Sequence, residues 1–314
     1  MGVGNFSISP VITYSNSDAT LTSNYWADYE YVWGDEFNDG RINGILWNYG
    51  TLARSEDDVK KNIYHDRNLV QVNNSGKAVF TVEYDSTEGK YYTPPDLHTK
   101  STMNYKYGYI EMRAKLPLVK NAWSTFWMQS VVDNTGTVVP ASEENKNNYK
   151  AEIDVYETLG ADDTLLISNL HKWYMPEVYN QTGLNGTNGV KHEQLKSSYK
   201  GTISISRDEY HIIGMEWTEE YMKMFVDGVP FVTYTFSELD SKYDTSVDNR
   251  AFDGGDNKYY TTMNGFLEPL LVSIGTTVKN ASSPDLSTLP HEYYIDWVRL
   301  YQKNPVANTT IWTK

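Results

Sequence analysis

Three carboxylates fall within six consecutive positions near the middle of the chain, in the run EIDVYE at residues 152–157. Apolar β-branched residues alternate with the first two acids, which is the period-2 pattern of a half-buried strand. Strict alternation places Glu152 and Asp154 on one face but buries Glu157 in the core, which is costly for a charge. A β-bulge, one extra residue near Tyr156, would return Glu157 to the face of the other acids. We therefore expect three carboxylates on one exposed face.

Carboxylates in this arrangement can hydrolyse a glycosidic bond with retention of configuration, provided that two carboxyl groups lie about 5–5.5 Å apart. Glu152 would attack the sugar carbon and Glu157 would protonate the leaving oxygen. Asp154 would share a proton or a hydrogen bond with Glu152 and hold it in place. The alternative is a solvated acidic strand face, since three acids at set positions recur by chance in roughly one chain in fifteen of this length.

The elements around this run are predicted to be strands. Residues 109–116 alternate cleanly, with Ile110, Met112 and Ala114 on one face, and residues 123–128 read as a buried strand beside them. Nowhere does a helical stripe of about 12 residues occur, and no internal repeat is present. Four polar loops separate the strands, at 49–65, 131–149, 174–200 and 237–264. Many strands with long loops predict a single all-β sandwich.

Charge and composition narrow the class of partner. The chain has 314 residues and a formal net charge of −14, from 41 acidic residues against 27 Lys and Arg. This surplus argues against nucleic acid or an anionic membrane surface as the partner. No stretch approaches the roughly 18 apolar residues of a membrane span. Because the chain has no cysteine, it has no disulfide, thiolate metal site or cysteine nucleophile.

Aromatic content and the N-terminus add two weaker indications. Aromatic residues make up 14% of the chain, with 26 Tyr and 9 Trp. Strand propensity accounts for much of this content, yet aromatic faces also stack on sugar rings, so the excess fits a carbohydrate partner. Residues 1–5 show no basic region followed by an apolar run. The protein is therefore expected to be either cytoplasmic or without the signal peptide that it once carried.

Several segments, in order between residues 30 and 302, resemble glycoside hydrolase family 16. The central carboxylate run matches the bulged variant of the family motif, in agreement with the bulge expected from burial. The remaining segments that carry the resemblance are residues 35–37, 107–117, 126–128, 216–218, 226–228 and 294–301, together with Trp123 and His211. The resemblance implies a β-jelly-roll sandwich of two curved antiparallel sheets, with a substrate cleft on the concave face. It also implies retaining, endo-acting hydrolysis of internal β-glycosidic bonds.

The resemblance divides the chain and assigns the site. Residues 30–302 would form the catalytic domain, residues 1–29 a lead-in packed on it, and residues 303–314 a tail or linker. Glu152 would be the nucleophile, Asp154 its partner and Glu157 the acid/base. Substrate-binding roles are expected for an aromatic and histidine set, although core or structural roles are the alternative. That set is Trp123, Trp127, His171 and Trp173.

Catalysis in such a protein needs no cofactor, but a structural calcium ion is expected from the resemblance. Asp296 matches an acid that often binds calcium on the convex side, and Glu36 could join it as a second oxygen ligand. The expected partner is a β-linked polysaccharide or oligosaccharide glycan. We expect a monomer that acts after secretion or at the cell surface.

Two departures from the family pattern bear on the substrate. The β-1,3-glucanases of the family usually carry a Trp-Gly-Asn-x-Glu run after the first Trp-Asn, whereas here residues 47–58 lack it. They also tend to end with a Gly-Gly-x-Trp-Pro segment, which residues 274–278 do not match. These departures favour an endo-β-galactosidase, with a laminarinase-like endo-β-1,3-glucanase as the alternative. A sugar-binding jelly roll without turnover, such as a lectin or adhesin, is the alternative from another class.

Overall fold

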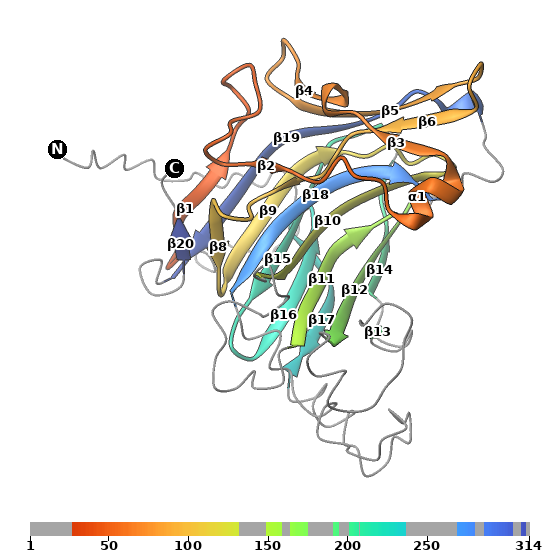
Figure 1. Cartoon of the computed structure of the whole chain (residues 1–314). Helices are drawn as coiled ribbons and strands as arrows, with labels where there is room; N and C mark the ends of the chain where they lie inside the picture. Colours follow the sequence, from red (N-terminus) through yellow and green to blue (C-terminus); the bar gives the residue numbers. More distant parts are fainter. Residues whose placement is uncertain are drawn as a thin grey trace, which may run out of the picture.

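The computed structural model describes residues 27–131, 149–158, 164–174, 191–194, 201–206, 208–236, 269–279, 286–303 and 309–311. Within these ranges the regular secondary structure is almost entirely strand, arranged as two stacked sheets whose long strands curve together (Figure 1). Every pairing between neighbouring strands is antiparallel except that of β3 with β6. The predicted all-β jelly-roll sandwich is confirmed.

One sheet, called the outer sheet below, contains ten of the described strands. In order across the sheet they are β17 (Val229–Thr235), β16 (Tyr221–Val226), β15 (His211–Trp217), β9 (Gly108–Lys115), β19 (His291–Gln302), β5 (Ala78–Asp85), β6 (Lys90–Thr93) and β3 (Ile63–His65), with β1 (Glu30–Asp35) beside β19 and β4 (Val70–Val72) beside β5.

The second sheet, called the concave sheet below, also contains ten described strands. In order they are β13 (Lys191–Gln194), β12 (Leu165–Tyr174), β11 (Tyr149–Glu157), β10 (Ala122–Ser130), β18 (Leu270–Val278), β7 (Leu97–His98) and β2 (Asn48–Tyr49), with β14 (Gly201–Ser204) beside β12, β8 (Met103–Tyr105) beside β18, and β20 (Thr309–Ile311) beside β8.

Helix is confined to short pieces. The described helices are α1 (Glu56–Lys61) and two 3-10 turns, η1 (Arg67–Leu69) and η6 (Leu286–Thr288). Within the described ranges none of these has the length or the apolar character to cross a membrane.

The core lies between the sheets and follows from alternation along each strand. On β9, Ile110, Met112 and Ala114 are fully buried, as their spacing predicts. Each large apolar side chain buried in this way contributes roughly 1.5–3 kcal/mol to folding. A hydrogen bond between the hydroxyls of Tyr156 and Tyr293 joins the two sheets inside this core.

Two observations differ from simple expectation. Glu111 lies on the face of β9 predicted to be polar, yet it is only 2% exposed and accepts a hydrogen bond of 3.1 Å from the Tyr109 hydroxyl. Strand β20 lies within the segment expected to be a tail or linker, where it pairs with β8. Of the expected lead-in, residues 1–26 lie outside the described residues.

Candidate active site

Strand β11 contains the predicted bulge. On its pairing with β10, Phe126 faces Tyr156 and Trp127 faces Asp154, so Val155 is an extra residue on β11. Val155 and Tyr156 are both fully buried, although they are consecutive in the chain. Two successive apolar side chains thus enter the core, because the bulge interrupts the period of two.

The bulge returns Glu157 to the cleft side of the sheet. Against β12, Asp154 faces Asn169 and Glu157 faces Ile167, so two residues of β11 oppose one residue of β12. Glu157 is half-buried, whereas the side chains between the two acids are in the core. The interpretation of the central run as a bulged carboxylate strand is confirmed.

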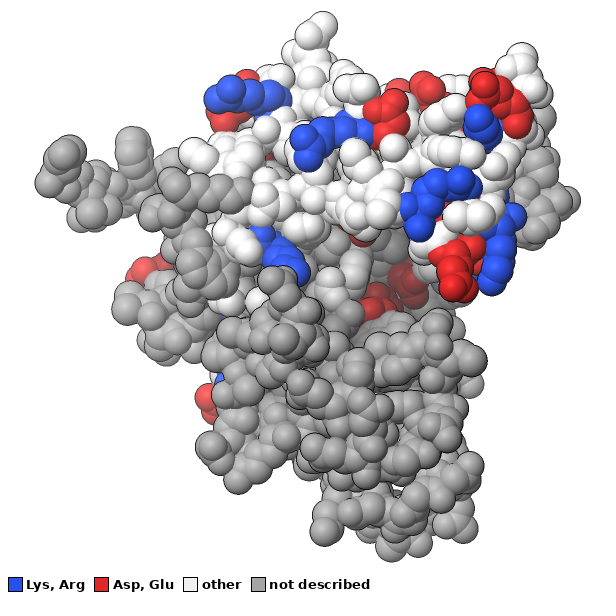
Figure 2. All heavy atoms as spheres, viewed as in Figure 1, with Lys and Arg blue, Asp and Glu red and all other residues white. Residues whose placement is uncertain are grey.

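Directly paired residues on neighbouring antiparallel strands present their side chains to the same face. The three acids therefore head three parallel rows across the concave sheet. These rows are Glu157–Thr125–Gly275, Asp154–Trp127–Ser273 and Glu152–Gln129–Leu271. In the space-filling view, acidic side chains lie in the recessed centre of this face, below the region of α1 (Figure 2).

Two of the acids lie close to an imidazole. The Nε2 atom of His171 is 2.9 Å from an Oδ atom of Asp154, and both side chains are nearly fully buried. Glu152 faces His171 across the pair of strands and is half-buried. One oxygen or nitrogen atom of each of the three side chains lies within 4.8 Å of the others. This closeness permits the proton sharing or hydrogen bonding predicted between Glu152 and Asp154.

In the described part of the chain these three side chains are also the one group of acidic and imidazole residues close enough to share a metal ion. Asp296 and Glu36 do not belong to it. Asp296 binds both Lys77 and Arg113, and Glu36 forms a two-bonded pair with Arg299. Carboxylates that basic side chains neutralise do not fit a calcium site, which needs uncompensated oxygen ligands. The calcium prediction thus has no support in this geometry.

Trp123 acts directly on one of the predicted catalytic acids. Its indole N–H donates a hydrogen bond of 3.0 Å to Oε1 of Glu157. The ammonium of Lys279 lies 3.4 Å from the centre of the Trp123 ring and covers one of its faces. Trp123 is thus placed beside the reacting groups, with its outer ring face in contact with a cation.

Other predicted binding residues differ in how far they are described. Trp127 is half-buried on the cleft face in the row of Asp154. Trp173 belongs to β12, but its side chain lies outside the described residues. Most of three of the predicted polar loops, 131–149, 174–200 and 237–264, also lies outside them.

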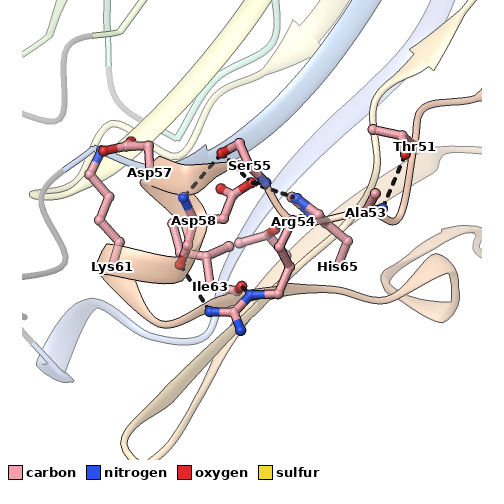
Figure 3. A network of polar contacts seen from close by, with 10 residues as sticks. Thr51, Ala53, Arg54, Ser55, Asp57, Asp58, Lys61, Ile63 and His65 are labelled. Carbon is pink, nitrogen blue, oxygen red and sulfur yellow. Dashed lines mark hydrogen bonds and ion pairs between the residues drawn. The ribbon is translucent and has the colours of Figure 1, made fainter.

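The fourth predicted loop, 49–65, contains a helix that the sequence analysis missed. Ser55 caps α1 by accepting from the amide of Asp58 at 3.1 Å, while the Asp58 carboxylate accepts from the Ser55 amide at 2.7 Å (Figure 3). This reciprocal capping box is worth about 1 kcal/mol for each cap bond. The signal was present as Ser-x-x-Asp followed by Lys60 and Lys61, with left-handed Asn62 at the end.

The same hydrogen-bond network fixes the position of the 49–65 loop and its helix α1 relative to β6. Ring nitrogen Nε2 of His65 lies 3.3 Å from Asp58, and Nδ1 lies 3.0 Å from the Thr93 hydroxyl. Burial works to raise the pKa of Asp58, but bonds from Ser55 and His65 outweigh it and lower that pKa. The guanidinium of Arg54 binds the carbonyls of Asp58 and Ile63, which closes the turn (Figure 3).

Comparison with known proteins identifies similar chains. The family model described as glycosyl hydrolases family 16 matches residues 57–253, more than half of the sequence. The chain is 24% identical over 302 residues to glucan endo-1,3-beta-glucosidase A1 of Niallia circulans, which covers 91% of this chain and 40% of that protein. It thus spans about two fifths of the length of that relative.

Two further relatives differ in what their names describe. Beta-glucanase of Rhodothermus marinus is 24% identical, over 91% of this chain and 88% of that protein. Beta-1,3-glucan-binding protein of Penaeus monodon is 29% identical over 143 residues, 44% of this chain and 34% of that protein.

A solved structure, the laminarinase catalytic domain from Thermotoga maritima, matches with a TM-score of 0.59 and 24% identity. The match covers 88% of this chain and 98% of that one, and it supports the jelly-roll fold.

Proposed function

Because this chain belongs to glycosyl hydrolase family 16, we propose that it is a retaining endo-β-glycosidase in which Glu152 is the nucleophile and Glu157 the acid/base. The observation that carries the proposal is the bulge at Val155, which brings three carboxylates of one strand to the cleft face. A regular strand of the same sequence would bury Glu157.

The contacts of each acid fit a separate role. Glu152 attacks the sugar carbon while Glu157 protonates the leaving oxygen. This step forms a covalent glycosyl ester on Glu152 and releases one part of the glycan with a free hydroxyl end. The indole of Trp123 binds Oε1 of Glu157, so Oε2 is the atom that carries the transferable proton. In the second step Glu157 takes a proton from water, which attacks the ester and releases Glu152.

Asp154 supports the nucleophile. His171 holds the Asp154 carboxylate at 2.9 Å, and the Asp154 side chain in turn lies beside Glu152. A side chain locked in this way keeps the nucleophile oriented without contacting the leaving group.

The experiment that tests the mechanism is NMR of the first product released from a β-linked oligosaccharide. Retention predicts that the β-anomer appears first and mutarotates later. An α-anomer as the first product would remove Glu152 from the role of nucleophile.

For the substrate we propose a β-1,3-linked glucan, since the names of the relatives at 24% identity describe glucanases. This departs from the preference for a β-galactoside derived from the two missing cleft segments, which no comparison supports. A digest of laminarin, mixed-linkage β-glucan, agarose and a mucin glycan, read by mass spectrometry, decides between them. Laminarin depolymerised to oligosaccharides is the expected result, and cleavage of agarose or mucin glycan alone would overturn it.

Binding without turnover is the second candidate function. The similarity to a β-1,3-glucan-binding protein favours it, because a cleft can hold a glycan without cleaving it. The variant Glu157→Gln separates the two functions when reducing ends are measured on the same glycans. Wild type should release them and the variant should not; binding by both proteins with no release from either would establish a lectin.

A further inference from the structure

A fourth acid, Asp96, reaches the cleft from outside the central strand. It follows the sequence Thr93-Pro94-Pro95, which links β6 to β7. Both prolines are buried, and the Asp96 carbonyl accepts a hydrogen bond of 2.7 Å from the amide of Gly50. Because each proline fixes its own backbone angle, this short linker holds Asp96 in a defined position.

The carboxylate of Asp96 lies over the cleft side of β18. The Ser273 hydroxyl donates to Oδ2 of Asp96 at 3.4 Å, and the Trp127 side chain is near enough to act on the pKa of Asp96. A Cβ atom on Gly275 would lie only 1.8 Å from Oδ1 of Asp96. The glycine therefore leaves the space that the carboxylate fills.

These contacts locate Asp96 relative to the reacting groups. Ser273 and Trp127 share a row with Asp154, and Gly275 shares a row with Glu157. Strands β18 and β11 are separated by β10, so Asp96 lies about 10 Å from the strand of the catalytic acids, at ~4.8 Å per strand. At that distance it reaches a sugar next to the cleaved bond but not the bond itself.

The Asp96 carboxylate is largely buried but accepts few hydrogen bonds from the described part of the chain. Among the described residues, Ser273 donates a hydrogen bond to it, Trp127 lies near it, and no Lys or Arg pairs with it. Burial raises the pKa of Asp96 to about 6, although Ser273, His65 and Trp127 act to lower it. A carboxylate offers about four lone-pair positions. Positions beyond these contacts remain for groups that enter the cleft.

We propose that Asp96, together with Ser273 and Trp127, forms a subsite that binds hydroxyls of a neutral sugar and rejects sugars with sulfate or carboxylate groups. The chemistry follows from the acceptor atoms: sugar hydroxyls can donate to the carboxylate, whereas an anionic substituent meets a like charge. The proposal rests on the proposed glycosidase function and names the charge class of its substrate.

The test compares Asp96→Asn with wild type on laminarin and on sulfated laminarin of equal chain length. The asparagine keeps the size and one acceptor oxygen but removes the charge. The ratio of kcat/KM on the sulfated to the neutral glycan should rise about tenfold in the variant. An unchanged ratio would overturn the proposal.

A second variant tests placement rather than charge. Gly275→Ala leaves Asp96 intact but forces its carboxylate out of contact with Ser273, since the added methyl group occupies its place. We expect kcat/KM on laminarin to fall about 10- to 100-fold, the loss typical of a hydrogen bond to a charged group. No fall in a folded Gly275→Ala protein would overturn the subsite.

The matched control is Glu83→Gln, which removes the same charge from an exposed position on β5 of the outer sheet. It should leave both the ratio and the rate on laminarin unchanged. If wild type cleaves no glycan, the proposed function fails. The subsite is then tested by calorimetry, which compares the binding of neutral and sulfated oligosaccharides. Tighter binding of the neutral oligosaccharide, reduced in Asp96→Asn, would support the subsite; equal binding would overturn it.

Discussion

The concave and outer sheets differ in what their carboxylates bind. On the concave sheet, Glu157 accepts from an indole N–H, and Asp154 contacts an imidazole. On the outer sheet, Asp296 lies between Lys77 and Arg113, and two nitrogens of Arg299 bind Glu36 at 2.7 and 2.9 Å. These two outer acids are thus neutralised by permanent cations, whereas the partners of these two cleft acids are a neutral and a titratable side chain.

This difference separates acids that can react from acids that only support the fold. The bond from Glu36 raises the pKa of Arg299 and fixes both charges. A buried outer acid, Glu216, combines both kinds of partner: it accepts from the Tyr29 and Tyr221 hydroxyls at 2.8 and 2.9 Å, and the Lys223 ammonium lies farther away, at 3.9 Å. A carboxylate paired with a permanent cation is held in its ionised form, so Asp296 and Glu36 are poorly suited to donate a proton to a sugar.

The largest expected effect comes from removing the proposed nucleophile. Glu152→Gln should lower kcat on the preferred glycan by roughly 10⁴-fold or more, as is typical when a group acting in the covalent step is removed. Its melting temperature should stay close to that of wild type because the change is isosteric. The measurement is reducing-sugar release alongside a thermal melt.

Glu36→Gln is the matched change on the outer sheet. It breaks the pair with Arg299, which is partly exposed, so the free energy of unfolding should fall by at most about 1 kcal/mol. Activity should remain within about twofold of wild type. A large loss of activity in Glu36→Gln would break the contrast between the sheets.

A further effect on stability, without loss of a catalytic group, concerns the pH dependence at Asp96. Its folded pKa of about 6 lies above the ordinary value, so the folded state holds the proton more tightly. Wild type should therefore lose stability as pH rises from about 4 to about 6. Asp96→Asn should be more stable at pH 7 by roughly 1–2 kcal/mol after solvent screening, and this gain should vanish near pH 4. Thermal melts across pH measure it; a gain independent of pH would contradict the origin in Asp96.

The smallest effect concerns Asp296. Its replacement by alanine leaves Lys77 and Arg113 without their shared acid, which should cost about 1 kcal/mol, or about 2–4 °C in melting temperature. A chelator should not change the melting temperature of wild type, since basic side chains already neutralise Asp296. A chelator-sensitive melt that disappears in Asp296→Ala would instead establish the calcium site.

Much of the fold was predictable because hydrophobic period is local. The alternation of Ile110, Met112 and Ala114 sufficed to orient β9. The bulge followed from one misfit, since a charge at Glu157 could not be buried without it. The same reasoning failed for Glu111, because its partner Tyr109 supplies the hydrogen bond that makes burial tolerable.

The rest could not be read from local sequence. Asp96 meets Ser273 and Gly275 across more than half of the chain, and no spacing rule connects such distant positions. The N-terminal cap of α1 could be predicted from Ser55 and Asp58, but a six-residue helix is too short to show a hydrophobic stripe. Contacts between distant segments, not propensity, decide which acids lie together.

The bulge at Val155 has a consequence for how this strand tolerates change. The placement of the cleft acids depends on the number of residues between Asp154 and Glu157, while the two side chains between them serve the core, by packing and by the hydrogen bond of Tyr156 to Tyr293. A conservative exchange of Val155 for isoleucine alters a few contacts. Loss of that single codon would instead leave one residue between the two acids, so that regular alternation would keep Glu157 on the cleft face and the strand would need no bulge; the number of residues between the acids therefore decides whether this strand must bulge.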